Sequence, residues 1–182
     1  MVGLHVPHAV IVLRPATAAD VPVLAPFAAE AFTAAFGHLY RPEVVALFLS
    51  EWRTKKAYRD ALAVPAKRIQ LAHFDGRLAG YAMVGLGDGF AERPEPQPSR
   101  PVLLSQLYCA ADMTGLGLGA VLMDWAIAEA RNWQADALQL SVFSQNFGAQ
   151  RFYRRYGFEH VADIDFWVGN HRDDELLYEL KL

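Results

Sequence analysis

The chain has 182 residues, with 17 lysines and arginines against 20 aspartates and glutamates, a formal net charge of −3 and an isoelectric point near 6.0. This length suits one domain, and the acidic balance argues against a nucleic-acid-binding surface. The single cysteine, Cys109, excludes an internal disulfide and is typical of a reducing cytoplasm, where we expect the protein. We predict no signal peptide, no apolar stretch long enough to span a membrane and therefore no membrane partner. Residues 1–9 are predicted to form a loose leader.

The first half of the chain predicts a strand, a group of helices and then a hairpin. Proline 42 suits the first position of a helix, and the dipeptide Asp75-Gly76 between two apolar runs is a strong hairpin signal. In chain order, the predicted elements are a strand at Val10–Arg14, a helix capped by Thr17 or Asp20 that runs to about Phe36, helices at Pro42–Glu51 and Lys55–Ala63, and strands at Ile69–Phe74 and Leu78–Leu86.

The second half opens with Gly85–Pro101, a segment so rich in proline and glycine that we predict a loop. After it we predict a strand at Val102–Cys109, a helix at Leu118–Asn132, a strand at Leu138–Phe143, a helix at Phe147–Tyr156, and closing strands at Phe158–Val168 and Glu175–Leu180. The order βααα-βββ-α-β-α-ββ predicts an α/β fold with a mixed central sheet and helices on both faces. Strands on both sides of the loop belong to that one sheet.

Three alternating glycines, Gly115, Gly117 and Gly119, lie between a predicted strand and a predicted amphipathic helix. Glycine lets the backbone turn sharply and approach a phosphate closely. The unpaired amides of a first helical turn, together with the helix dipole, attract anions. A simple turn would need one glycine, so the pattern predicts a loop that grips a phosphorylated ligand with main-chain amides.

Two common phosphate loops fit this segment poorly. A P-loop needs a lysine, and no lysine or arginine lies between Arg100 and Arg131. The dinucleotide fingerprint is matched by Gly115, Gly117 and Ala120, but the next predicted strand has no acidic residue for a ribose. Dinucleotide binding therefore stays a distant alternative.

A second motif lies further along, in SVFSQNFGAQRFYRRYGFE at 141–159. Asn146 suits a helix N-cap, and Asn146, Ala149 and Tyr153 are spaced to share one helical face. Gly157 suits the residue that ends the helix, and Phe158 then begins a strand. Both motifs together resemble the GNAT N-acetyltransferase superfamily, in which a [Q/R]-x-x-G-x-[G/A] loop precedes an N-x-x-A-x-x-F-Y-x-x-x-G-F segment. Thr114 departs from the loop pattern, because it stands where the family has Gln or Arg.

The resemblance implies a single GNAT domain over 1–182 that binds acetyl-CoA, needs no metal and acetylates an amine by direct attack in a ternary complex. It implies that Tyr153 protonates the departing thiolate. It also implies that an amide of a bulged strand, that of Leu107, Tyr108 or Cys109, stabilises the oxyanion. The cofactor-binding residues that it implies are Leu107, Tyr108, Cys109, Thr114, Gly115, Leu116, Gly117, Leu118, Gly119, Ala120, Asn146, Ala149, Phe152 and Tyr153. A catalytically silent acetyl-CoA sensor is the alternative, and a homodimer is expected from the family.

The general base and the acceptor are less determined by the sequence. Leu103 occupies the position where many relatives carry a glutamate, so we consider Glu30, Glu43, Tyr108 or a water chain as the base. We interpret Cys109 as a buried filler. For the acceptor pocket, the segments FGHLYRPE and VGNHRDDE resemble a branch related to polyamine acetyltransferases and imply a small amine or polyamine. The predicted pocket residues are Glu30, His38, Tyr40 and Trp167, and we expect Asp173, Asp174 and Glu175 to form a solvated turn.

Overall fold

The computed structural model describes residues 10–182, so the predicted leader at 1–9 lies outside the described residues. The elements in chain order are β1 (Ile11–Pro15), η1 (Ala18–Asp20), α1 (Val21–Phe36), η2 (Gly37–Leu39), α2 (Pro42–Trp52), α3 (Lys55–Ala63), β2 (Lys67–Phe74), β3 (Arg77–Leu86), β4 (Pro101–Cys109), η3 (Ala111–Met113), α4 (Leu118–Asn132), β5 (Ala137–Phe143), α5 (Phe147–Arg155), β6 (Glu159–Val168) and β7 (His171–Lys181). The predicted order of strands and helices is confirmed.

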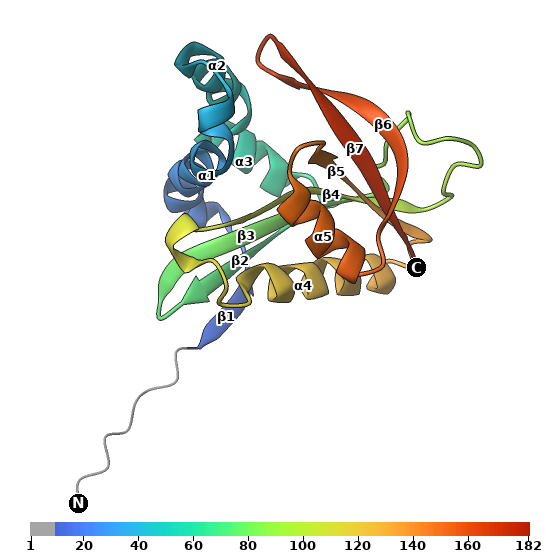
Figure 1. The fold of residues 1–182 in the computed structure, drawn as a ribbon. Coiled ribbons are helices and arrows are strands. Elements are labelled where there is room, and N and C mark those ends of the chain that lie inside the picture. Colours follow the sequence, from blue (N-terminus) through green and yellow to red (C-terminus); the bar gives the residue numbers. More distant parts are fainter. Residues whose placement is uncertain (1–9) are drawn as a thin grey trace, which may run out of the picture.

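The strands form a seven-stranded sheet in the order β1-β2-β3-β4-β5-β7-β6, with one parallel pair, β4 and β5, among antiparallel ones. Helices α1 to α3 cover one face and α4 the other (Figure 1). Alternate β3 side chains serve the two faces: Tyr81 and Met83 pack with α1 and α3, whereas Ala82 and Val84 pack with α4. The predicted mixed α/β sheet is therefore correct.

Strands β4 and β5 pair over a short distance and then separate. Their register runs only from Pro101 opposite Ala137 to Leu103 opposite Gln139. Beyond that point β4 continues to Cys109 and β5 to Phe143 without pairing to each other. A register shift in the β3–β4 ladder leaves Ser105 as an extra residue opposite Met83 and Val84, and such a bulge bends its strand. The sheet is thus open in its middle.

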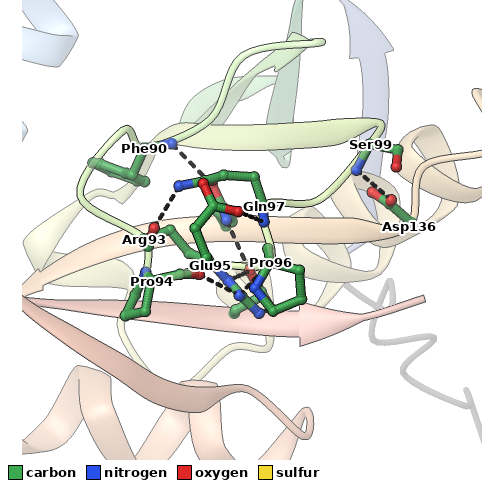
Figure 2. A network of polar contacts seen from close by, with 10 residues as sticks. Phe90, Arg93, Pro94, Glu95, Pro96, Gln97, Ser99 and Asp136 are labelled. Atoms are coloured by element: carbon green, nitrogen blue, oxygen red, sulfur yellow. Dashed lines mark hydrogen bonds and ion pairs between the residues drawn. The ribbon is translucent and has the colours of Figure 1, made fainter.

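The closed end of this opening is fastened by the loop at 87–100. Arg93 reaches Glu179 of β7 with nitrogen–oxygen distances of 2.8 and 3.0 Å, and Gln139 of β5 donates to the same carboxylate at 2.8 Å. The amide of Phe90 donates to Gln139, and that of Ser99 to Asp136, at 3.0 and 2.6 Å (Figure 2). Because Glu179 and Gln139 are buried, these bonds satisfy charges and amides that would otherwise be costly there.

The tip of the β6–β7 hairpin packs against α2, where the turn residue Gly169 has a φ of +58° and lies close to Val44 and Leu47. Strand β7 begins at His171, four residues before the predicted start at Glu175. The prediction of a solvated turn at Asp173–Glu175 is therefore wrong: the hairpin extends toward α2, and Asp173 is 6% exposed. Asp174 alone of the three faces solvent.

The segment Ala18–Leu39 is long and apolar enough to cross a membrane by length and composition, so the prediction that no stretch meets this criterion is wrong. A core helix meets the same criterion. In this fold α1 buries Leu24, Ala28 and Phe32 against the sheet and its neighbouring helices, so the apolar residues of the helix have a place in the protein interior.

Candidate active site

A cleft of about 710 Å³ occupies the opening between β4 and β5 and continues beneath α1 and α2. One end is formed by the start of α4 and by α5, the other by α1, α2, β6 and β7. Ten of the predicted site residues line it: Tyr40, Leu107, Tyr108, Cys109, Thr114, Gly119, Asn146, Ala149, Phe152 and Tyr153. Segments far apart in the chain therefore meet at this cleft, as the two motifs predict.

The glycines at the α4 end have two different structural roles. Gly115 and Gly117 have φ of +81° and +84°, a left-handed conformation that favours glycine, and a Cβ on either would meet no atom. These two are needed for backbone shape. Gly119 has an ordinary φ, and its Cβ would lie 3.7 Å from the ring of Phe152, an ordinary contact. The free protein thus has room for a side chain at Gly119, which lines the cleft directly.

The first turn of α4 presents unpaired amides. Its first intrahelical bond runs from the amide of Val121 to the carbonyl of Gly117 at 3.1 Å, and no side chain caps the helix. The amides of Leu118, Gly119 and Ala120 have no acceptor within the helix for this reason. The side chain of Leu118 is buried in the core, so this residue offers a ligand only its backbone. This geometry suits an anion.

The amides of β4 that face the opening can be identified from the strand's alternation. The amide of Ala110 donates to the carbonyl of Ala79 on β3 at 2.8 Å. Since successive amides of a strand point to opposite sides, those of Leu107 and Cys109 point away from β3, toward the opening. The amide of Tyr108 points toward β3. Of the three predicted oxyanion donors, two are therefore free to serve.

Helix α5 begins as predicted. The side chain of Asn146 accepts a hydrogen bond from the amide of Ala149 at 3.1 Å, which leaves the side-chain NH₂ of Asn146 free at the cleft. Tyr153 lies further along the same helix, on the same face. Its hydroxyl makes no hydrogen bond to the described residues, and burial, Tyr108 and Glu175 raise its pKa far above the ordinary value. Tyr153 therefore carries its proton at neutral pH and can donate it.

The far end of the cleft is lined by aromatic side chains. Phe32 stacks on Phe48 with ring centroids 4.4 Å apart, and Phe36 and Phe166 lie nearby. Tyr40 donates a hydrogen bond to Asp173, whose other oxygen lies 3.3 Å from Nε2 of His171. The Tyr40 contact joins η2 to β7 and helps to close this end.

Glu175 of β7 brings a carboxylate into the same cleft. Burial is the main reason why its pKa is raised to about 7, the neighbouring Asp173 raises it further, and a hydrogen bond with Ser141 opposes the shift. Its Oε2 is buried without a hydrogen-bond partner among the described residues. A carboxylate poised near neutral pH and short of partners is suited to exchanging protons.

Several predicted residues lie away from the cleft. Glu30 is exposed and lines a separate hollow between α1 and η3, and Glu43 is exposed and paired with Arg41 at 3.1 Å. His38 and Trp167 are exposed and do not line the cleft. Gly115, Leu116, Gly117, Leu118 and Ala120 flank it through the loop and the first turn of α4. Tyr108 does line it, but its pKa, raised mainly by burial, keeps the phenol protonated at neutral pH, so it is not available to accept a proton.

Cys109 also lines the cleft without the properties of a nucleophile. Burial raises its pKa to about 11, so the thiol is protonated at neutral pH. Cys109 is only partly buried, so it is not the buried filler that we expected, but its protonated thiol agrees with the expectation that it is not a nucleophile. Within residues 10–182, no cluster of three or more His, Cys, Asp or Glu side chains has the arrangement of a metal site.

A family model for the "Acetyltransferase (GNAT) family" matches residues 29–158, well over half of the chain. The chain belongs to the GNAT acetyltransferase family. An uncharacterized N-acetyltransferase of Mycobacterium tuberculosis is 33% identical over 156 residues, covering 86% of this chain and 94% of that protein. This GNAT protein is accordingly an N-acetyltransferase by family, and thus an acyltransferase.

Two further matches are more distant. The spermine/spermidine N(1)-acetyltransferase of Bacillus subtilis is 32% identical over 95 residues, which cover 52% of this GNAT protein and 60% of the relative. The crystal structure of the PaiA N-acetyltransferase of Thermoplasma acidophilum, solved in complex with coenzyme A, superposes with a TM-score of 0.77 at 19% identity over 95% of this chain and 99% of that one. The superposition confirms the predicted GNAT fold.

Sequence reasoning missed two charged residues of the cleft. Glu175 lies in a stretch of acidic residues that is typical of a solvated turn, and only the extended hairpin turns it inward. Arg53 lies between α2 and α3, where a cation at a helix end is ordinary. It is nevertheless only 9% exposed and lines the cleft. No signal in the sequence distinguishes either one from a surface residue.

Proposed function

We propose that this protein transfers the acetyl group of acetyl-CoA to a primary amine by direct attack in a ternary complex. The observation that carries the proposal is one cleft, open through the middle of the sheet, that holds both Tyr153 and Glu175. One of these side chains keeps its proton at neutral pH, and the other exchanges its proton near pH 7. An amine acylation needs both an acid and a base of this kind.

Acetyl-CoA would bind at the α4 end. The unpaired amides of Leu118, Gly119 and Ala120 would hold its pyrophosphate, as a helix N-terminus holds anions generally. The side-chain NH₂ of Asn146 would donate to the pantetheine arm, which would enter between β4 and β5. The coenzyme A found in the T. acidophilum relative supports this choice of cofactor.

The reaction would then proceed in one attack. Glu175, directly or through a water, takes a proton from the acceptor ammonium, whose solution pKa is near 10.4 for an alkyl amine. The neutral nitrogen attacks the thioester carbonyl, whose developing charge is stabilised by the amide of Leu107 or Cys109. The carbon–nitrogen bond would form and the carbon–sulfur bond would break, with Tyr153 giving its proton to the CoA thiolate. The second proton, which the nitrogen loses as it becomes an amide, would return to Tyr153 through water.

A polyamine is a second candidate for the acceptor. The partial similarity to the B. subtilis spermine/spermidine enzyme favours it, and the carboxylates of Asp173 and Glu175 offer negative charge at the acceptor end. Asp173 is already bonded to Tyr40 and His171, so Glu175 is the carboxylate of the two that has a free oxygen.

The decisive experiment measures release of the CoA thiol from acetyl-CoA with a panel of amines, for the wild type and for Tyr153→Phe. We expect turnover by the wild type and a loss of about a hundredfold or more in kcat for the variant, with the Kd for acetyl-CoA unchanged. Binding of acetyl-CoA without turnover by any amine would favour the sensor. Failure to bind acetyl-CoA would overturn the proposal, and stabilisation by NAD instead would support the dinucleotide alternative.

A further inference from the structure

Arg53 lies at the corner between α2 and α3, and its backbone is fixed from both sides. Its amide donates to the carbonyl of Leu49 at 3.0 Å, which ends α2, and the next residue, Thr54, caps α3 by accepting from the amide of Ala57 at 3.0 Å. The side chain is directed inward and is 9% exposed. The guanidinium is thus held at the cleft by two helix ends, so it is poorly placed to turn out to solvent.

The faces of the guanidinium are covered by aromatic rings. Its central carbon lies 5.1 Å from the ring centroid of Phe48 and 5.6 Å from those of Phe32 and Tyr108. Such contacts stabilise the cation across its faces. They provide no hydrogen-bond acceptor for its N–H groups, which lie in the plane of the guanidinium.

The in-plane donors of Arg53 are short of acceptors. Nη1 donates to the carbonyl of Trp52 at 3.3 Å, a hydrogen bond with the Tyr108 side chain helps to raise the Arg53 pKa, and Nε is buried with no partner. Among residues 10–182 no aspartate or glutamate forms an ion pair with it. Burial opposes its charge, but nearby tyrosines, Tyr108 first, favour it, and the pKa of Arg53 stays above its ordinary value. A buried cation without a counterion is costly, so such a group is normally paired.

A carboxyl with one unpartnered oxygen faces the same cleft. Oε2 of Glu175 is likewise buried without a partner, and both residues line the aromatic end. Arg53 comes from the corner between α2 and α3 and Glu175 from β7, and the two are not bonded to each other. One cleft therefore offers a carboxyl that ionises near neutral pH and a cation without a counterion, which together complement a molecule that carries an amine and an oxyanion.

We propose that the acetyl acceptor is an amine that also carries an oxyanion, most simply the carboxylate of an amino acid, and that Arg53 binds this group while Glu175 receives the amine. The inference rests on the transferase activity proposed above and names its substrate class. The guanidinium fork matches a carboxylate or a phosphate in two parallel hydrogen bonds. The rings of Phe32 and Phe48 would contact the apolar part of the acceptor. A polycationic amine would meet the like charge of Arg53.

The test compares free amino acids with their carboxamides, alongside 2-aminoethyl phosphate, spermidine and spermine, in the CoA-release assay. We expect the wild type to prefer an acid over its amide by about ten- to a hundredfold in kcat/KM, the range of a charge-assisted hydrogen bond. Removing the carboxylate lowers the amine pKa and favours reaction, so any preference for the acid arises in spite of this effect. The phosphate arm separates a carboxylate site from one for phosphorylated amines.

Three variants connect the preference to Arg53. Arg53→Met keeps the length of the side chain and should abolish the preference by raising KM for the acid alone. Arg53→Lys keeps a point charge and should retain a weaker preference. The matched control, Arg59→Met, changes an exposed arginine of α3 and should behave as wild type. Circular dichroism and the Kd for acetyl-CoA show whether each variant is folded.

The outcomes separate the two proposals. Preference of the wild type for amides or polyamines, or an equal loss for acids and amides in Arg53→Met, overturns the role of Arg53 while the transferase stands. If no amine releases CoA, the transferase proposal fails. Equilibrium binding of the acids and amides to the protein saturated with CoA then decides the inference alone. Tighter binding of the acid, lost in Arg53→Met, supports it, and equal binding overturns it.

Discussion

At the first turn of α4, the groups open to a ligand are backbone amides, whereas at the end of the cleft between α1, α2 and β7 they are charged side chains. The amides of Leu118, Gly119 and Ala120 are placed by one short stretch of sequence. Arg53 and Glu175, in contrast, are brought together by helix corners and a long hairpin. The first kind of site is local, and the second depends on the whole fold.

The proposed base, Glu175, lies at the end with charged side chains, and Glu175→Gln should have the largest effect on activity. Because the carboxyl must be ionised to accept a proton, kcat/KM of the wild type should rise with pH through about 7. The variant should lose about a hundredfold in kcat/KM at pH 8 and lack this limb. Glu43→Gln, on the exposed start of α2, is the matched control. Full activity of Glu175→Gln with an unchanged pH profile would contradict the role of Glu175.

The free energy of unfolding should depend on the ionisation of the same carboxyl, and it can be measured without any substrate. The pKa of Glu175 is raised from 4.5 to about 7 in the folded protein, so the folded state holds this proton more tightly than the unfolded chain. Stability therefore falls as pH rises between these values, by at most about 3 kcal/mol. In urea titrations, Glu175→Gln should lack this part of the pH dependence. A constant difference between variant and wild type at pH 5 and pH 8 would show that the pKa is ordinary.

The contrast between the two ends also explains what sequence reasoning could reach. The cap at Asn146 and the left-handed glycines at Gly115 and Gly117 are local, since each depends on bonds within a few residues. Most strands and helices follow from hydrophobic period and turn residues in the same way, and Leu118–Asn132 agrees at both ends. The general base could not be found like this, because the burial of Glu175 depends on where the β6–β7 hairpin packs.

The bulge in β4 is a feature that could be predicted only in part. The family resemblance implies a bulged strand before the glycine loop, and the register shift is found at Ser105. Which amide faces the opening, however, follows only from the pairing of Ala110 with Ala79 on the neighbouring strand. The family resemblance predicts that this strand is irregular, while the direction of its free amides is set by the neighbouring strand.

The local character of the amide end is tested by two glycines that lie two residues apart. Gly117→Ala places a side chain at a φ of +84° and should cost about 1 to 2 kcal/mol of stability, with weaker binding of acetyl-CoA. Gly119→Ala adds a Cβ that fits in the free protein, so its stability should be equal or higher. Urea denaturation measures both. Equal stability of Gly117→Ala and wild type would mean that the loop does not need its left-handed residue.

Thr114 offers the smallest and most specific test, because it lines the cleft where relatives carry a Gln or Arg. If the α4 end holds the pyrophosphate with amides alone, Thr114→Arg should add a charged donor and lower the Kd for acetyl-CoA by up to about tenfold at low salt. The gain should shrink as salt rises, since residue 114 is exposed. Thr114→Ala should bind as wild type, because the threonine hydroxyl makes no hydrogen bond to the described residues. If Thr114→Arg leaves the Kd for acetyl-CoA unchanged at every ionic strength, the pyrophosphate binds elsewhere. The first turn of α4 would then not be the phosphate site.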